Sequence, residues 1–316
     1  MVSEGPASTM PADGARASTG PASTVTMVVD GPFSLAAAAS FGFGQRSGRS
    51  DTDGLMRLAF VADDLSHHVG AVLRQEPGGG LTAAITGALD VGAAERQIRR
   101  VLCLDHPADG WLAAGHADPV LGAVQAAHPG QRPVLFHSPY EAAAWAVLSQ
   151  RRHRSQAAAL RDRLAAATGR EFTLAGQLTR AFPLPEKLLA LDGFPGIEPV
   201  RLQRLHAVAR AALDGQLDAT RLAALPAAQA LPALQSLPGL GPFYARLVYL
   251  RATGVTDALA DNEPLFAACL QHFYGLAEPP AGPAVERMAT PWRPFRTWAS
   301  VLFRLAGERA GVVPHR

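Results

Sequence analysis

The 316-residue chain has very little cysteine and almost no lysine. Its two cysteines, Cys103 and Cys269, cannot supply the four thiolates of a cysteine-ligated iron–sulfur cluster. Two cysteines also make no disulfide framework, so both are expected to be reduced thiols, as is typical of the cytosol. Lys187 is the only lysine among 29 basic residues, so any chemistry that uses a lysine nucleophile has a single candidate.

Other common signals are missing as well. No stretch of about 18 uncharged apolar residues occurs, so a transmembrane helix is not expected. The chain start lacks a basic segment followed by an apolar core, which argues against a secretory signal. The ten histidines show no spacing typical of metal ligands, and no Gly-x-Gly-x-x-Gly follows a strand. The net charge of +2 neither favours nor excludes nucleic acid as a partner.

The first 24 residues are rich in small and turn-forming residues. Gly-Pro-Ala-Ser-Thr occurs at 5–9 and again at 20–24. Such a composition cannot bury a core, so residues 1–24 are predicted to be a disordered tail. A misassigned start codon would explain them equally well.

Residues 25–105 predict a small α+β domain with an antiparallel sheet. Short β-type runs occupy 25–29, 55–62, 68–73 and 81–86, with turn residues between them. Residues 92–104 then show helical spacing, with Ile98, Val101 and Leu102 on one side and arginines on the other.

From residue 106 to residue 316 every periodic segment is predicted to be helical. Ser138-Pro139-Tyr140-Glu141 is a capping box, with serine at the N-cap, proline at the first helical position and glutamate at the third. The expected helices are 119–127, 139–150, 156–168, 173–179, 185–191, 199–213, 218–224, 227–235, 242–254, 262–274 and 292–307. The fold class is therefore α+β: a small antiparallel α+β domain followed by a mainly helical region.

Three segments could carry chemistry. In the first, Leu237-Pro238-Gly239-Leu240-Gly241 closes one helix and opens the next, over about 227–254, and Asp261 follows at the start of another helix. The two glycines allow close approach of a ligand, and the N–H groups of a helix N-terminus favour a phosphate. From these residues alone, an ordinary helix cap with a tight turn is the more frequent explanation.

The other two segments flank this hairpin in sequence. Residues 136–156 hold the capped helix that ends in Val147-Leu148-Ser149-Gln150, followed by Arg151-Arg152-His153-Arg154. Near the C-terminus stands Trp292-Arg293-Pro294-Phe295-Arg296-Thr297-Trp298. An amphipathic helix with a solvated basic turn, and an aromatic helix start packed on a core, are the simple explanations of these patterns.

Taken together, the three segments resemble the helix–hairpin–helix DNA glycosylases, and most closely the AlkA-type 3-methyladenine DNA glycosylase II family. The resemblance implies that Gly239 and Gly241 hold a DNA phosphate and that Asp261 is the catalytic carboxylate. It also implies that the backbone carbonyls of Gln235, Leu237 and Leu240 can bind a monovalent cation, Na⁺ or K⁺.

The same resemblance assigns the remaining site residues. Leu148 matches an apolar wedge that fills the gap left by a flipped nucleotide. The residues expected to contact DNA beside it are Gln150, Arg151 and Arg296. Aromatic faces would hold a cationic alkylated base, and the expected base pocket consists of Phe243, Phe295, Trp292 and Leu247.

The function implied is removal of alkylated purines, of the 3-methyladenine and 7-methylguanine type, by hydrolysis of the N-glycosidic bond. Bifunctional relatives carry a lysine two residues after the second hairpin glycine, where this chain has Phe243, so no lyase step is expected. The expected protein is a cytoplasmic, nucleoid-associated bacterial monomer on damaged double-stranded DNA, with no required cofactor. Two alternatives stay open: an inactive damage-binding protein, and a glycosylase for another lesion.

Overall fold

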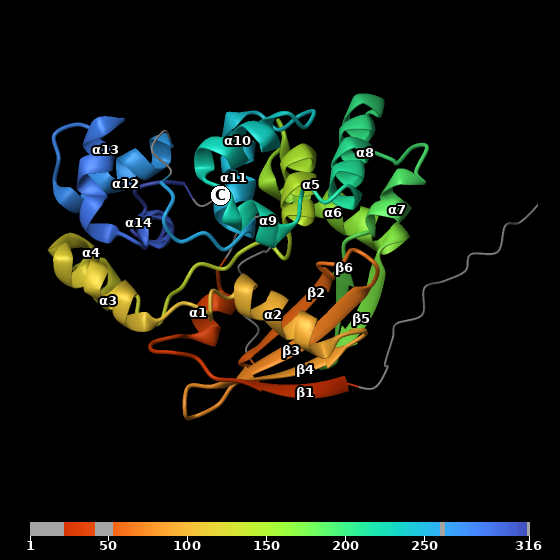
Figure 1. Ribbon diagram of the computed structural model, residues 1–316, viewed down its shortest axis with the longest axis horizontal. Coiled ribbons are helices and arrows are strands. Elements are labelled where there is room, and N and C mark those ends of the chain that lie inside the picture. The colour runs from red at the N-terminus through yellow and green to blue at the C-terminus, as the bar shows by residue number, and fades with distance from the viewer. Residues whose placement is uncertain (1–21, 42–52, 260–262, 315–316) are drawn as a thin grey trace, which may run out of the picture.

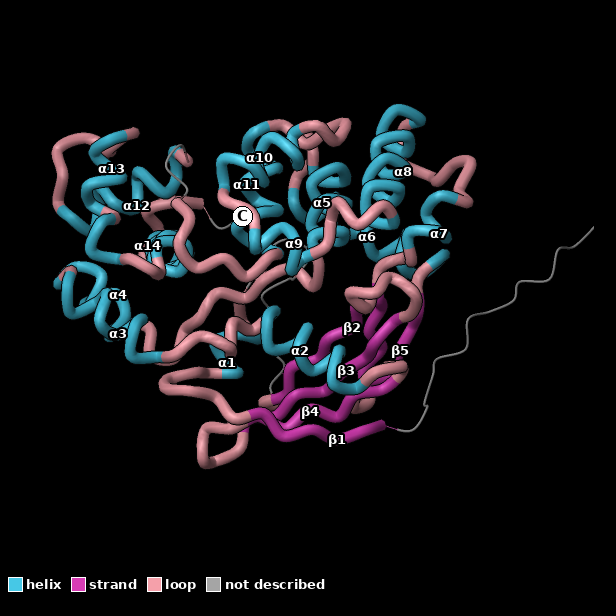
Figure 2. Tube along the Cα trace, viewed as in Figure 1, coloured by secondary structure: helices cyan, strands magenta, loops and turns pink. Residues whose placement is uncertain are grey.

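The computed structural model describes residues 22–41, 53–259 and 263–314. Strands gather at one end of the molecule and helices form the rest (Figure 2). This arrangement confirms the α+β class. None of the described helices is long and apolar enough to cross a membrane.

A four-stranded antiparallel sheet forms the N-terminal part. Its strands are β1 (Ala22–Met27), β2 (Leu55–Val61), β3 (His68–Gln75) and β4 (Leu81–Thr86), in the order β1-β4-β3-β2. Helices α1 (Leu35–Ala39) and α2 (Val91–Val101) share one apolar core with this sheet. The first strand begins inside the segment predicted to be disordered, because Ala22 pairs with Thr86 and Thr24 with Ala84. The prediction of a tail is therefore wrong for residues 22–24, and residues 1–21 lie outside the described residues.

A second, two-stranded sheet interrupts the helical region. Strands β5 (Arg170–Leu174) and β6 (Gln177–Ala181) form a hairpin whose turn, Ala175-Gly176, has positive φ angles of 43° and 79°. Phe172 and Leu174, two residues apart, are buried against the first sheet, in contact distance of Gly70. The prediction of an all-helical region with a helix at 173–179 is wrong, because the period along this segment is two and not 3.6.

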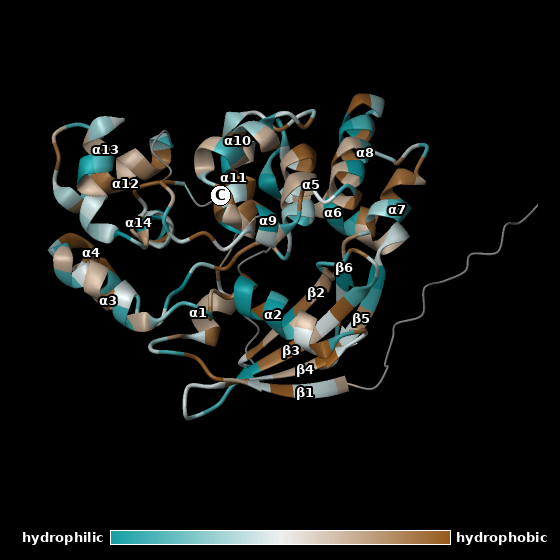
Figure 3. Cartoon of the chain, viewed as in Figure 1, coloured by the Kyte–Doolittle hydropathy of each residue, from teal (hydrophilic) through white to brown (hydrophobic). Residues whose placement is uncertain are grey.

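The helices divide into two halves, each with its own core. The first core belongs to α5 (Pro139–Ser149), α6 (Arg154–Thr168), α7 (Pro185–Leu189), α8 (Pro199–Leu213), α9 (Ala219–Ala224), α10 (Ala227–Gln235) and α11 (Pro242–Ala252). The second belongs to α3 (Ala108–Ala117), α4 (Pro119–Ala127), α12 (Pro264–Tyr274), α13 (Pro283–Met288), the 3-10 turn η1 (Thr290–Trp292) and α14 (Arg296–Arg309). Figure 1 shows α3 and α4 beside the C-terminal helices. Brown and teal alternate along α8, as expected of a helix with one buried face (Figure 3).

The start of α5 agrees in part with the capping box predicted from the sequence. Ser138 caps the helix, since its Oγ accepts a hydrogen bond from the Glu141 N–H at 3.2 Å. The Glu141 carboxylate does not return to the cap. It is 4% exposed and accepts a hydrogen bond from the Val61 N–H of β2 at 3.1 Å. Glu141 was predicted to cap the start of its own helix, and its side chain instead connects that helix to the sheet.

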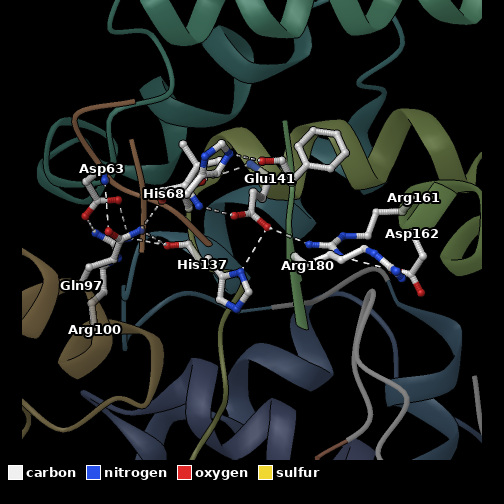
Figure 4. A network of polar contacts seen from close by, with 12 residues as sticks. Asp63, His68, Gln97, Arg100, His137, Glu141, Arg161, Asp162 and Arg180 are labelled. Atoms are coloured by element: carbon white, nitrogen blue, oxygen red, sulfur yellow. Dashed lines mark hydrogen bonds and ion pairs between the residues drawn. The ribbon is translucent and has the colours of Figure 1, made fainter. Parts of the chain in front are cut away.

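Glu141 belongs to a buried polar network between the sheet and the helices (Figure 4). His137 Nδ1 lies 3.1 Å from the Glu141 carboxylate, and Arg161 of α6 lies 3.6 Å from it. Burial alone raises the pKa of Glu141, but the attraction of His137 and Arg161 and the hydrogen bonds outweigh it and lower the pKa to about 2. The Gln97 amide of α2 extends the network by donating to the carbonyls of Val61 and His137.

Candidate functional site

The predicted hairpin is present between α10 and α11. Gly239 has a φ of 93°, a conformation that favours glycine, and a Cβ there would lie 2.9 Å from Cδ of Arg204. Gly241 is the N-cap of α11, and a Cβ on it would meet nothing within 4 Å. The N–H groups of the first turn of α11 have no carbonyl one turn earlier to bond. The hairpin thus presents an uncovered helix N-terminus, which is the geometry that an anion needs.

Gln150 connects this hairpin to the turn between α5 and α6. Its Nε2 donates to the Gly239 carbonyl, and its Oε1 accepts from Nη1 of Arg204 at 2.9 Å. Arg201, on the same face of α8, donates to the carbonyls of Val147 and Gln150 at the end of α5. The hairpin and this turn are therefore held as one unit. Gln150 was predicted to contact DNA, and its amide is instead engaged within the protein.

Arg151 lies at the tip of the α5–α6 turn. It is exposed and has a φ of 53°, which is uncommon for a residue with a side chain. Leu148, the predicted wedge, has 0% exposure and is part of the first helical core. The prediction for Leu148 is wrong in this structure, since α5 continues to Ser149 and turns the leucine inward. The exposed side chains of this turn are those of Arg151 and His153.

The loop after α11 is fixed by both helical halves. Arg296 at the start of α14 binds the Asp257 carboxylate at 2.5 Å and its carbonyl at 2.9 Å. Thr297 exchanges hydrogen bonds with the backbone of Ala258 at 3.0 and 2.9 Å. From the other half, Arg246 of α11 donates to the Leu259 carbonyl at 3.4 Å. Arg296 was predicted to contact DNA, but its guanidinium holds this loop.

Asp261, the predicted catalytic residue, follows this loop and lies outside the described residues. The anchors of the loop were not identified from the sequence. Arg246 and Asp257 belong to no recognisable sequence motif, and only their hydrogen bonds in the structure show their role. Burial lowers the pKa of Arg246.

The four residues of the predicted base pocket come from both helical halves. Trp292 is fully buried in the second core, where its Nε1 donates to the Asp118 carboxylate at 2.7 Å. Phe295 is also buried and packs on Trp298, with ring centroids 5.0 Å apart.

The other two pocket residues lie on α11, in the first half. Phe243 is 53% exposed beside the hairpin, and Leu247, one turn further on, is half-buried against the first core. The base pocket therefore stays a prediction that draws residues from both halves. A buried indole N–H needs a hydrogen-bond acceptor, and Asp118 supplies it inside the core.

The hairpin carbonyls remain candidates for a monovalent cation. The Leu237 carbonyl accepts a hydrogen bond from the Leu240 N–H at 3.0 Å, which leaves it a second lone pair. Among the described residues, no group of three or more His, Cys, Asp or Glu side chains could hold a metal ion.

Comparison with known proteins identifies this fold. No protein-family model matches the chain. The 3-methyladenine DNA glycosylase of Archaeoglobus fulgidus superposes with a TM-score of 0.70 at 18% identity, covering 92% of this chain and all of that one. A Clostridium acetobutylicum 8-oxoguanine glycosylase/lyase, in complex with double-stranded DNA, gives a TM-score of 0.56 at 15% identity over 77% and 86% of the two chains. The fold is thus that of the helix–hairpin–helix DNA glycosylases.

Sequence similarity points to one group within the proteins that share this fold. Over 223 residues the chain is 30% identical to a probable bifunctional transcriptional activator/DNA repair enzyme AlkA of Mycobacterium tuberculosis. The match covers 67% of this chain and 42% of that relative, so the chain spans less than half of the curated protein. The resemblance to the AlkA-type family is confirmed by this sequence similarity and by the shared fold.

Proposed function

We propose that the protein is a DNA glycosylase that releases N-alkylated purines from double-stranded DNA and takes part in alkylation repair. One observation supports this most. The N-terminus of α11 at Gly241 is uncovered, and a hydrogen bond from Gln150 to the hairpin joins it to the turn that carries the exposed Arg151. A phosphate at the hairpin and a basic side chain at the turn would contact the duplex at two fixed points. The names of the AlkA relative and of the Archaeoglobus protein agree with this activity.

The chemistry proposed is hydrolysis without a lyase step. A carboxylate near the sugar stabilises the positive charge that develops as the N-glycosidic bond breaks, and it orients the attacking water. An alkylated purine is already a good leaving group, so one acidic residue is sufficient. The sequence assigns this role to Asp261. Phe243 stands where bifunctional relatives carry lysine, and Lys187 lies on α7, outside the hairpin.

Base release from methylated DNA tests the proposal. Duplex DNA treated with dimethyl sulfate is incubated with the protein, and the free bases are separated by chromatography. We expect 3-methyladenine or 7-methylguanine to appear, the strand to stay intact without heat or alkali, and borohydride to trap no covalent complex. Binding to abasic-site DNA without release of any base would instead favour the damage-binding alternative. A trapped complex would show that the reaction includes a lyase step.

Arg151 provides a test of the DNA contact. Replacing it with alanine removes one exposed cation at the tip of the turn, so affinity for duplex DNA should fall and the slope of log K against log salt should decrease by about one. Arg74→Ala removes the same charge from an exposed position on β3 and serves as the control. Fluorescence anisotropy at several salt concentrations measures both. Equal slopes for the two variants would exclude a phosphate contact by Arg151.

A further inference from the structure

Three charged side chains stand on one face of α8. Glu198 is the N-cap residue of this helix, and Arg201 and Arg204 follow at intervals of three residues, so all three lie on the same side. Figure 1 shows α5 between α8 and the hairpin helix α11, and α5 packs against both. This face of α8 therefore meets the end of α5 and the turn that follows it.

Two of these side chains hold the α5–α6 turn. Arg201 donates to three backbone carbonyls at the end of α5, the last of them that of Gln150, at 2.6 to 3.3 Å. The end of a helix leaves such carbonyls without partners, and the guanidinium supplies them. Glu198 accepts hydrogen bonds from Arg201 and from Arg152, each at 2.9 Å. The turn is thus attached to α8 on both sides of the exposed Arg151.

The third side chain, Arg204, completes a triangle of contacts with Gln150 and the hairpin. Its Nη1 donates to Oε1 of Gln150 at 2.9 Å, and Nε2 of Gln150 donates to the Gly239 carbonyl. A Cβ at Gly239 would lie 2.9 Å from Cδ of Arg204, so the arginine stem packs directly on the hairpin backbone. Because each of the three groups contacts the other two, the Gln150 amide cannot move without breaking a contact.

This triangle determines where the exposed cation lies. Gln150 directly precedes Arg151 in the chain, so the residue that binds the hairpin also fixes the start of the tip of the turn. A cation already fixed relative to the hairpin can contact a second phosphate without the further loss of conformational freedom that ordering a mobile turn would require. Gln150 is neutral, so this effect on DNA binding is separate from its own charge.

We propose that Gln150, held by Arg204, is a positioning residue that fixes the distance between the hairpin and Arg151, so that both contact phosphates of one duplex at the same time. The inference rests on the proposed glycosylase function and names the residues that set the spacing of its two DNA contacts. Gln150 and Arg204 act through Arg151, and neither supplies a contact to DNA.

Gln150→Met tests this in the full-length protein without changing any charge. Methionine is similar in length and lacks the amide that binds Gly239 and Arg204. We expect affinity for abasic-site duplex DNA to fall about fivefold, and the slope of log K against log salt to decrease by about one, since a mobile Arg151 no longer displaces a counterion. Fluorescence anisotropy at several salt concentrations measures both. Gln203→Met, at an exposed position on α8, is the control and should change neither.

A double-mutant cycle with Arg151→Ala separates positioning from a purely structural role. In that background Gln150→Met should lower the affinity by less than about twofold, because the contact that it positions is already absent. Arg204→Met keeps the stem against Gly239 and removes the donor, and its effect should depend on Arg151 in the same way. Thermal unfolding checks that each variant folds.

An undiminished loss of affinity in either double variant overturns the proposal, since the side chain would then act on the hairpin or on DNA by itself. An unchanged salt slope in Gln150→Met overturns it as well. A native protein that neither binds abasic-site DNA nor releases methylated bases contradicts the glycosylase proposal itself, which is a different outcome.

Discussion

Glu141→Ala is expected to destabilise the protein by about 3–5 kcal/mol, because it leaves His137 and Arg161 buried without their shared carboxylate. The same substitution removes the acceptor of the Val61 N–H, at the junction of β2 and α5. Urea unfolding followed by circular dichroism measures the free energy of unfolding. The effect should be among the largest of any single substitution, since Glu141 joins three elements of the fold.

Glu186→Ala is the matched control for this prediction. Glu186 lies in the first turn of α7 and is exposed, so its removal should change the free energy of unfolding by less than about 0.5 kcal/mol. If the two variants unfold at the same urea concentration, the buried network does not contribute to stability as its contacts indicate.

The network also predicts how stability depends on pH. The pKa of Glu141 is lowered in the folded state to about 2 from an ordinary value of 4.5. A carboxyl with a lowered folded pKa stabilises the protein fully above its unfolded pKa, and this contribution is lost as the pH falls from about 4.5 towards about 2. In Glu141→Gln this part of the acid sensitivity should be absent. Native and variant proteins are compared by thermal unfolding between pH 7 and pH 3.

The sequence predicted those features that local chemistry determines. Gly239 is needed because its φ is positive, while Gly241 leaves the start of α11 uncovered, and the sequence of the turn indicates both features. Ser138 likewise caps α5, as its side chain predicts. Each of these residues is specified by neighbours within a few positions, so pattern alone identifies it.

Long-range packing decided the features that were missed. Leu148 lies on α5, which is buried at every position from Pro139 to Leu148, and only its packing in the first core shows that the leucine points inward. The role of Trp292 depends on Asp118, 174 residues earlier in the chain. The β5–β6 hairpin was mistaken for a helix because its stabilisation comes from the packing of Phe172 on a distant sheet.

Gly241→Asp should separate DNA binding from stability. A Cβ at Gly241 meets nothing within 4 Å, and its φ of −69° suits any residue, so the fold accommodates a side chain there. Aspartate is also a good N-cap residue, because its carboxylate accepts hydrogen bonds from the first N–H groups of a helix. The melting temperature of the variant should therefore equal or slightly exceed that of the native protein.

The same carboxylate would occupy the N–H groups that we assign to a DNA phosphate, and it would add a negative charge facing the phosphate backbone. Affinity for abasic-site DNA should fall at least tenfold, about 1.4 kcal/mol of binding free energy. Gly193→Asp is the control, since a Cβ at that exposed glycine also meets nothing within 4 Å. Gly241→Ala should bind DNA more tightly than Gly241→Asp, because it adds bulk without charge. Unchanged affinity in Gly241→Asp would mean that the phosphate is bound elsewhere, and the hairpin would then be only a connection between α10 and α11.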